Sequence, residues 1–405
     1  MAARCRQARG ASMTRILLFS GKGGVGKTTA SAATAVAAAK RGYRTLVMSF
    51  DIAHSLSDSF DLDRKLFDFN EGLPQKVAPN LELQEIDIQH ELQRQWSEVY
   101  NYMSVLLTST GVSNMVAEEV AILPGTEDVI SLIYLNQYVQ QGRYDVIIVD
   151  CPPTGESLRF VNITSVLQWY IRRRFNVDRT LVKLARPLAS RLTSYDLPED
   201  SYFASLEQLF DRVKGIEGLL TDGNRTTVRL VSSAEKMVIR ETQRAYLYFN
   251  MYGMTVDQVV VNRLLPDTEY FAQWHKSQSA YLDHIQEYFS PMPVARLPLL
   301  EHEVVGLERL EDLAQRLYGD SDPTERYISG QPYQFAKQHE GRYRLQLLMP
   351  GADRGDIVLD RQGNDLIIRV GGFRRHVMLP RSVAQLDAVD AVLDKGMLKI
   401  DFARP

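Results

Sequence analysis

The stretch from Phe19 to Thr29, with the sequence FSGKGGVGKTT, constrains the fold of this chain more than any other feature. It matches the pattern G-x-x-x-x-G-K-[ST], in which a glycine-rich loop joins a strand to a helix. The apolar run at 15–20 predicts a buried parallel strand before the loop. Residues 29–40 are mostly alanine, the best helix former, and Gly42 marks the end of the predicted helix. This order predicts an α/β fold with a doubly wound, mainly parallel sheet.

The residue types of the loop predict a phosphate site. Glycines let backbone N–H groups turn toward one centre, and the helix N-terminus adds the positive end of its dipole. In such a loop the lysine, here Lys27, reaches the β- and γ-phosphates, and the Thr28 hydroxyl binds Mg²⁺. ATP and Mg²⁺ are therefore the predicted cofactors. The predicted nucleotide-binding residues of the loop are Gly21, Lys22, Gly23, Gly24, Val25, Gly26, Lys27, Thr28 and Thr29.

Two aspartates follow apolar runs that predict strands: Asp51 follows residues 44–50, and Asp150 follows residues 144–149. Open α/β sheets carry out chemistry at the carboxyl ends of their strands. We interpret Asp150 as a Walker-B carboxylate that holds Mg²⁺ through a bound water. The alternative is that Asp150 only caps the helix that follows it.

Three motifs together resemble one family of dimeric ATPases, the arsenical-pump and tail-anchored-protein-targeting ATPases. The loop carries a second lysine, Lys22, as in the deviant Walker A loop of this family. The sequences DIAHSLSD at 51–58 and DCPPTGESLR at 150–159 resemble its two switches. The resemblance implies a homodimer in which Lys22 reaches the partner's nucleotide and acts as an arginine finger does. It also implies that Asp51 orients the attacking water, so the predicted catalytic residues are Asp51, Lys22 and Lys27. The alternative for Lys22 is a solvated lysine at the loop edge.

The same resemblance implies the contacts to adenine. Asn262 follows the predicted strand at 256–261, where the family's matching asparagine hydrogen-bonds adenine, and Pro298 and Leu299 begin the family's closing segment near the base. An amide offers the donor and the acceptor that an adenine edge requires. The alternative is an asparagine that caps its own backbone. The segment from Thr268 to Tyr281 lacks the C-x-x-C pair with which some members clamp their dimers, so we predict no zinc site.

The chain divides into an ATPase domain at 13–317, a polar linker at 318–341 and an all-β sandwich at 342–405. Helical patterns at about 87–140 and 160–220 predict a helical subdomain, which holds hydrophobic cargo in the resembling family. Residues 162–191 interleave aromatics with arginines, which indicates either a client surface or a packed helix with a basic face. The motifs LMPGAD, MLPRSV and AVLDKGML resemble an α-crystallin (small heat-shock-protein) domain. This sandwich either holds apolar clients or docks onto the ATPase.

Composition excludes several classes of function. The net charge of −3 gives no reason to expect nucleic acid as a partner, and no apolar run reaches the length of a membrane span. The cysteines are Cys5 and Cys151, too few for a disulfide framework, which favours a reducing, cytoplasmic location. Residues 1–12 are interpreted as a disordered or added extension, with a transit-peptide remnant and a plastid stromal location as the alternative.

The sequence therefore predicts a Mg²⁺-dependent ATPase that hydrolyses ATP in a homodimer and thereby switches a helical surface that binds a hydrophobic protein client. The alternatives are the motor ATPase of an anion or metalloid pump and a partition-type scaffold ATPase.

Overall fold

The structure, a computed structural model, describes residues 13–51, 55–62, 70–86, 126–154, 207–208, 211–380 and 382–404. The expectations for residues 1–12 and for most of the helical subdomain (87–125 and 155–206) lie outside these residues. So do residues 52–54 of the first switch and 155–159 of the second.

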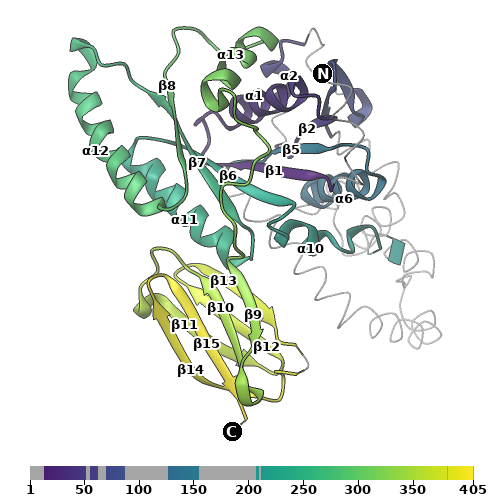
Figure 1. Cartoon of the computed structure of the whole chain (residues 1–405), viewed down its shortest axis with the longest axis vertical. Coiled ribbons are helices and arrows are strands. Elements are labelled where there is room, and N and C mark those ends of the chain that lie inside the picture. The colour runs from purple at the N-terminus through teal and green to yellow at the C-terminus, as the bar shows by residue number, and fades with distance from the viewer. Residues whose placement is uncertain are drawn as a thin grey trace, which may run out of the picture.

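A large central sheet organises the first domain (Figure 1). Every described strand of this sheet runs parallel to its neighbours except β3 (Gln75–Ala78), which pairs antiparallel with β4 (Leu81–Glu85). The strand order confirms the predicted mainly parallel α/β fold. In spatial order the strands are β3 (Gln75–Ala78), β4 (Leu81–Glu85), β2 (Thr45–Ser49), β5 (Val146–Asp150), β1 (Arg15–Ser20), β6 (Thr226–Ser233), β7 (Val256–Leu264) and β8 (Val294–Pro298).

Helices cover both faces of this sheet because each central strand buries side chains on both sides. On one face, the apolar side of the alanine-rich helix α1 (Lys27–Lys40) packs with α13 (Leu307–Tyr318) and the short α2 (Ser55–Ser59). On the other face lie α6 (Thr126–Gln141), α10 (Ile216–Thr221), α11 (Lys236–Met251) and α12 (Ala272–Phe289). Short 3-10 turns occur at Asn70–Gly72, Glu269–Phe271, His339–Gly341 and Arg354–Asp356. Within the described residues, no helix has the length and apolarity needed to cross a bilayer.

The C-terminal domain is the predicted all-β region, built from two antiparallel sheets whose apolar faces share one cluster. The strand β9 (Tyr333–Lys337) lies inside the stretch for which we predicted a linker, and it pairs with β10 (Tyr343–Leu348) at the edge of one of these sheets. One sheet contains β14 (Asp387–Asp394), β15 (Met397–Ala403), β10 (Tyr343–Leu348) and β9 (Tyr333–Lys337). The other contains β11 (Ile357–Gln362), β12 (Asp365–Val370) and β13 (Phe373–Met378).

The segment between α13 and β9 accepts hydrogen bonds from arginine side chains of β1 and β6 in the large sheet. Arg229, fully buried on β6, donates to the Glu325 carbonyl at 3.1 Å, and Arg15 on β1 donates to the Thr324 carbonyl at 3.0 Å. Asp257 on β7 lies 3.3 Å from Arg15 and 3.6 Å from Arg229. Two buried cations thus gain one carboxylate and two carbonyl acceptors, which explains why this polar stretch lies against the core.

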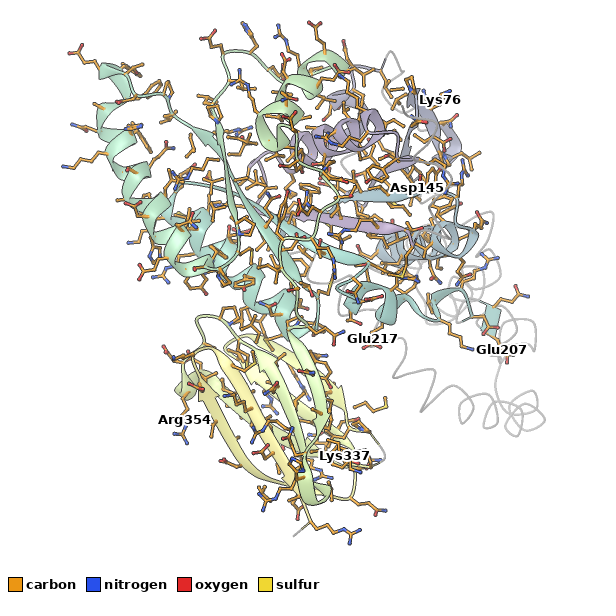
Figure 2. All side chains as sticks on the ribbon, in the orientation of Figure 1. Lys76, Asp145, Glu207, Glu217, Lys337 and Arg354 are labelled. Carbon is orange, nitrogen blue, oxygen red and sulfur yellow. The ribbon has the colours of Figure 1, made fainter. Side chains whose placement is uncertain are left out.

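The sandwich packs against the ends of α11 and α12 (Figure 1). Arg375 of β13 is buried, lies 4.4 Å from the ring centroid of Tyr333 and 5.8 Å from that of Tyr252, and donates to the Met251 carbonyl. Tyr252 in turn donates to the Arg374 carbonyl at 2.9 Å. Glu217 on α10 lies beside this boundary (Figure 2). The two domains therefore share a buried interface.

Candidate functional site

The glycine loop between β1 and α1 has the backbone shape that its sequence requires. Gly24 and Gly26 have φ values of +80° and +92°, in the left-handed region that glycine adopts readily. A Cβ on Gly21 would lie 2.1 Å from the Val231 carbonyl oxygen, so the loop is pressed against β6. Gly26 is the N-cap of α1, which directs the amino end of a long helix at the loop.

The two loop lysines differ in environment. Lys27 is 7% exposed and its ammonium donates to the Lys22 carbonyl at 3.3 Å, which folds its side chain back over the loop. Lys22 is half-buried, and its ammonium forms no ion pair with the part of the chain that the structure describes. Gly23 and Gly24, which follow it, are exposed. This rim of the loop can face a second molecule.

The sheet brings the two predicted aspartates beside the loop. In register, Asp150 on β5 pairs with Phe19 on one side and with Ser49 on the other, and Asp51 lies two residues beyond Ser49. The Asp51 backbone N–H donates to the Ser49 hydroxyl at 3.1 Å, which shapes the turn that leaves β2. Asp51, Asp150, Lys27 and Thr28 thus converge although they lie on three separate segments.

Asp150 fits a hydrated Mg²⁺. Its side chain is 1% exposed, and one carboxylate oxygen accepts no hydrogen bond from the described residues. Burial raises the pKa of this carboxyl to about 7, although the Thr28 and Ser31 hydroxyls and the Lys27 charge oppose the shift. A buried, unpaired carboxylate oxygen is costly unless a cation or its water satisfies it. Thr28 and Asp150 are the residues that would hold the ion.

Both switch segments touch the loop where they are described. The Thr28 hydroxyl lies 3.4 Å from the hydroxyl of Ser55, the first residue of α2. The Thr154 backbone N–H donates to the Gly21 carbonyl at 3.2 Å, and the buried Thr154 hydroxyl has no partner among the described residues. A change at the phosphates can therefore reach both segments through direct contacts.

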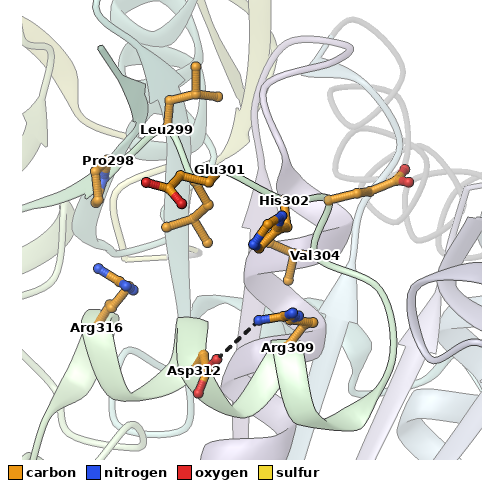
Figure 3. A pocket seen from close by; sticks show the side chains of 10 residues that line it. Pro298, Leu299, Glu301, His302, Val304, Arg309, Asp312 and Arg316 are labelled. Carbon is orange, nitrogen blue, oxygen red and sulfur yellow. Dashed lines mark ion pairs between the residues drawn. The ribbon is translucent and has the colours of Figure 1, made fainter. Parts of the chain in front are cut away.

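A cavity of about 480 Å³ beside α1 is a candidate base pocket. Its walls include Gly26 and Thr29 of the loop, Asn262, and the predicted residues Pro298 and Leu299. An outer hollow of about 280 Å³ adjoins it, where Arg309, Asp312 and Arg316 of α13 face the segment 298–304 (Figure 3). The predicted adenine residues therefore gather at the end of the loop helix.

Asn262 uses part of its amide within the protein. Its Nδ2 donates to the Val25 carbonyl at 2.9 Å, and its Oδ1 accepts from the Arg263 backbone N–H at 2.9 Å. An amide carries two N–H donors and two acceptor lone pairs, so one of each is left for a base. Both readings of this asparagine are thus compatible with its geometry.

Sequence reasoning assigned no individual role to three residues of this site. Glu85 ends β4, and its carboxylate accepts from the backbone of α2. Asp58 and Ser59 of α2 line the base cavity. Glu85 is marked by the same signal that identified Asp51 and Asp150, a carboxylate at the carboxyl end of a buried strand. The described residues contain no cluster of three or more His, Cys, Asp or Glu suited to a metal ion.

Comparison with known proteins agrees with both domains. Residues 14–319 match the family described as anion-transporting ATPase, and residues 340–402 match the HSP20-like domain found in ArsA. An Aquifex aeolicus protein named as a candidate arsenical pump-driving ATPase is 44% identical over 393 residues, covering 95% of this chain and 99% of that protein. A Chlorobaculum tepidum protein with the same assignment is 40% identical over 96% of each chain. "ATPase get3" of Pyrenophora tritici-repentis is 30% identical over 75% of this chain and 91% of its own.

Proposed function

The chain belongs to the anion-transporting ATPase family and is an ATP-hydrolysing P-loop enzyme, and from this premise we propose that it works as a Mg²⁺-dependent homodimer whose nucleotide state switches a hydrophobic client-binding surface. The observation that carries the proposal is the convergence of Asp51, Asp150 and Thr28 on the glycine loop. This arrangement supports the roles proposed for Asp51 in orienting the attacking water and for Thr28 and Asp150 in holding Mg²⁺.

In the proposed mechanism, Lys27 and the loop N–H groups bind the β- and γ-phosphates. Thr28, and Asp150 through a water, would hold Mg²⁺, which would supply charge neutralisation on the phosphates when bound. Asp51 orients the attacking water. Lys22 of each subunit reaches the partner's nucleotide. Its position beside the exposed Gly23 and Gly24 is suited to this reach. Asn262, Pro298 and Leu299 hold the adenine.

We favour a protein client over a metalloid because of the cysteines. Cys151 is fully buried beside Asp150, and burial raises the pKa of its thiol well above the ordinary value. A buried neutral thiol is a poor metal ligand, and Cys5 is the other cysteine of the chain. The helical segments that would form the client surface lie outside the described residues. Two cysteines are too few for a disulfide framework, so we also propose a reducing, cytoplasmic location.

Mixing two inactive variants tests the trans role of Lys22. Lys22→Ala and Asp51→Asn should each bind ATP and fail to turn it over. In a mixed dimer, the nucleotide on the Lys22→Ala subunit keeps its own Asp51 and receives Lys22 from the other subunit. After exchange of subunits, about a quarter of the wild-type rate should return, because about half of the dimers are mixed and each has one intact site. A mixture as inactive as its components would refute the trans arrangement.

A client-binding assay distinguishes the proposed client-binding ATPase from the motor ATPase of a pump. Asp51→Asn, loaded with ATP and Mg²⁺, should retain a fluorescent apolar transmembrane peptide that the ADP-bound protein releases. A peptide of equal length with polar residues is the control. Stimulation of ATP turnover by arsenite or antimonite, together with no peptide binding in any nucleotide state, would instead support the pump motor that several relatives are named for.

A further inference from the structure

Glu85 is a buried carboxylate that the mechanism above does not use. It ends β4, is 1% exposed, and pairs in register with Ser49 at the end of β2. Two residues beyond Ser49 lies Asp51. Glu85 therefore stands at the same sheet edge as the catalytic carboxylates, one strand further from the glycine loop.

The Glu85 side chain holds the amino end of α2. Its Oε1 accepts from the backbone N–H groups of Leu56 and Ser57, each at 2.9 Å. These are orphan donors of the first helical turn, and a charged acceptor binds them more strongly than a neutral one. The contact spans 28–29 positions of sequence, so it pins α2 to the sheet rather than to its own chain neighbours.

The helix α2 touches the nucleotide site at both of its ends. At its first residue, the Ser55 hydroxyl lies 3.4 Å from Thr28 Oγ1. At its last, the Ser59 carbonyl accepts from the Gly306 N–H at 3.0 Å, and Asp58 and Ser59 line the base cavity. Between them Leu56 is fully buried. One short element thus connects the predicted metal ligand with the predicted base pocket.

We infer that Glu85 is a positioning residue for ATP hydrolysis, which keeps Ser55 beside Thr28 by anchoring the first turn of α2. The inference rests on the Mg²⁺ role proposed for Thr28. If α2 loses its anchor, Ser55 moves away from Thr28. Catalysis and Mg²⁺ affinity then fall, while the glycine loop, which follows β1 and so lies three strands away from β4 in the sheet, still binds the phosphates.

Two variants of Glu85 and one control test the inference. Glu85→Ala removes the acceptor. Glu85→Gln keeps one oxygen that can accept both N–H groups but removes the charge. The control is Glu82→Gln on the same strand, where the carboxylate pairs with Arg143 at 2.8 Å and accepts from Tyr144, far from the loop in register. For each protein we would measure kcat, the half-saturating Mg²⁺ concentration, ATP affinity in EDTA, and Tm.

In Glu85→Ala, kcat should fall about 10- to 100-fold and the half-saturating Mg²⁺ should rise several-fold, because displacement of a supporting element by about 1 Å has effects of this size. ATP affinity in EDTA should stay within about twofold. Glu85→Gln should recover most of the loss, and Glu82→Gln should keep the wild-type kcat and Mg²⁺ dependence even if its Tm falls. Should Glu85→Ala fail to fold, Glu85→Gln carries the test, with a drop in kcat of about threefold at unchanged ATP affinity in EDTA.

Two results would overturn the inference. One is a kcat and a Mg²⁺ dependence within about twofold of wild type in the folded Glu85 variants. The other is a parallel loss of Tm, ATP affinity and kcat, equal in Glu85→Ala and Glu85→Gln, which would make Glu85 a purely structural cap. A wild-type enzyme with no Mg²⁺ dependence would instead contradict the proposed metal role itself, so the two failures are distinguishable.

Discussion

Gly26 and Asn262 are in such close contact that a single methyl group should report on the loop. A Cβ added at Gly26 would lie 2.4 Å from Asn262 Nδ2, and Gly26 has a φ of +92°. Gly26→Ala therefore combines backbone strain with a clash against the side chain that donates to the Val25 carbonyl at 2.9 Å. The variant should bind ATP more weakly than the wild type.

The two costs can be estimated separately. A left-handed alanine costs about 1–2 kcal/mol relative to the favoured backbone. Displacement of Asn262 from the Val25 carbonyl costs about 1 kcal/mol. Together, about 2–3 kcal/mol corresponds to ATP binding that is about 30- to 150-fold weaker. In the background Asn262→Ala the clash is absent, so Gly26→Ala should cost only the backbone strain, about 5- to 30-fold.

A double-mutant cycle measures the difference. ATP affinity of the wild type, both single variants and the double variant would be determined by titration with a fluorescent ATP analogue at fixed Mg²⁺. Gly218→Ala in α10, where an added Cβ meets open space, should leave the affinity unchanged. An equal effect of Gly26→Ala with and without Asn262, or a Gly26→Ala variant that binds as the wild type does, would refute the idea that Asn262 braces the loop.

Two further predictions concern stability. Arg375→Ala should lower the free energy of unfolding by about 2–4 kcal/mol, because it removes two desolvated cation–π contacts, and denaturant unfolding should separate into two transitions. The control Arg374→Ala, at an exposed neighbour, should change neither the free energy nor the number of transitions. A single unchanged transition in Arg375→Ala would count against a docked sandwich. Burial alone would raise the pKa of Asp322, but hydrogen bonds from the Tyr43 hydroxyl and from the N–H and hydroxyl of Thr324 lower it below its ordinary value. The stability that Asp322 contributes is therefore present above its unfolded pKa and is lost as the pH falls through its folded pKa. Asp322→Ala should therefore cost about 1–2 kcal/mol at pH 7, and this cost should shrink as the pH falls through the folded pKa of Asp322, as measured by urea unfolding at neutral and acid pH. A cost independent of pH would contradict this.

Local sequence patterns were enough to predict much of the fold and the centre of the site. The strand, glycine loop and helix at 15–40 are specified by near neighbours, so periodicity and glycine positions suffice to locate them. Asp51 and Asp150 could be chosen because carboxyl ends of parallel strands meet at one edge, a rule that needs only the strands to be recognised. The sandwich was recognisable because its strands alternate apolar and polar residues around glycine turns.

The missed features depend on partners far away in sequence. Tyr333–Lys337 reads as part of a polar linker, and it becomes a strand because β10 offers it an edge. The helix α12 buries only Gln278, Ile285 and Phe289, too sparse a pattern to predict a long amphipathic helix. Glu85 carries the same strand-end signal as Asp51 and Asp150, but its contact with the N–H groups of α2 lies 28–29 positions away in sequence and could not be read from its neighbours. Pairing between distant segments decided each case.

The position of the sandwich limits how it can act on the ATPase. The helix α11 begins just after the carboxyl end of β6, the strand against which Gly21 is pressed, and it ends at Met251, whose carbonyl accepts from Arg375 of the sandwich. The sandwich therefore docks at the opposite end of α11 from the glycine loop (Figure 1). Direct contact with a bound nucleotide in the same subunit is excluded by this placement. An effect of the sandwich on turnover can pass through α11, through the shared apolar cluster, or through the segment between α13 and β9 that hydrogen-bonds to β1 and β6. Since Arg375→Ala loosens that junction without touching the loop, it should alter turnover only as far as these connections couple the sandwich to the loop.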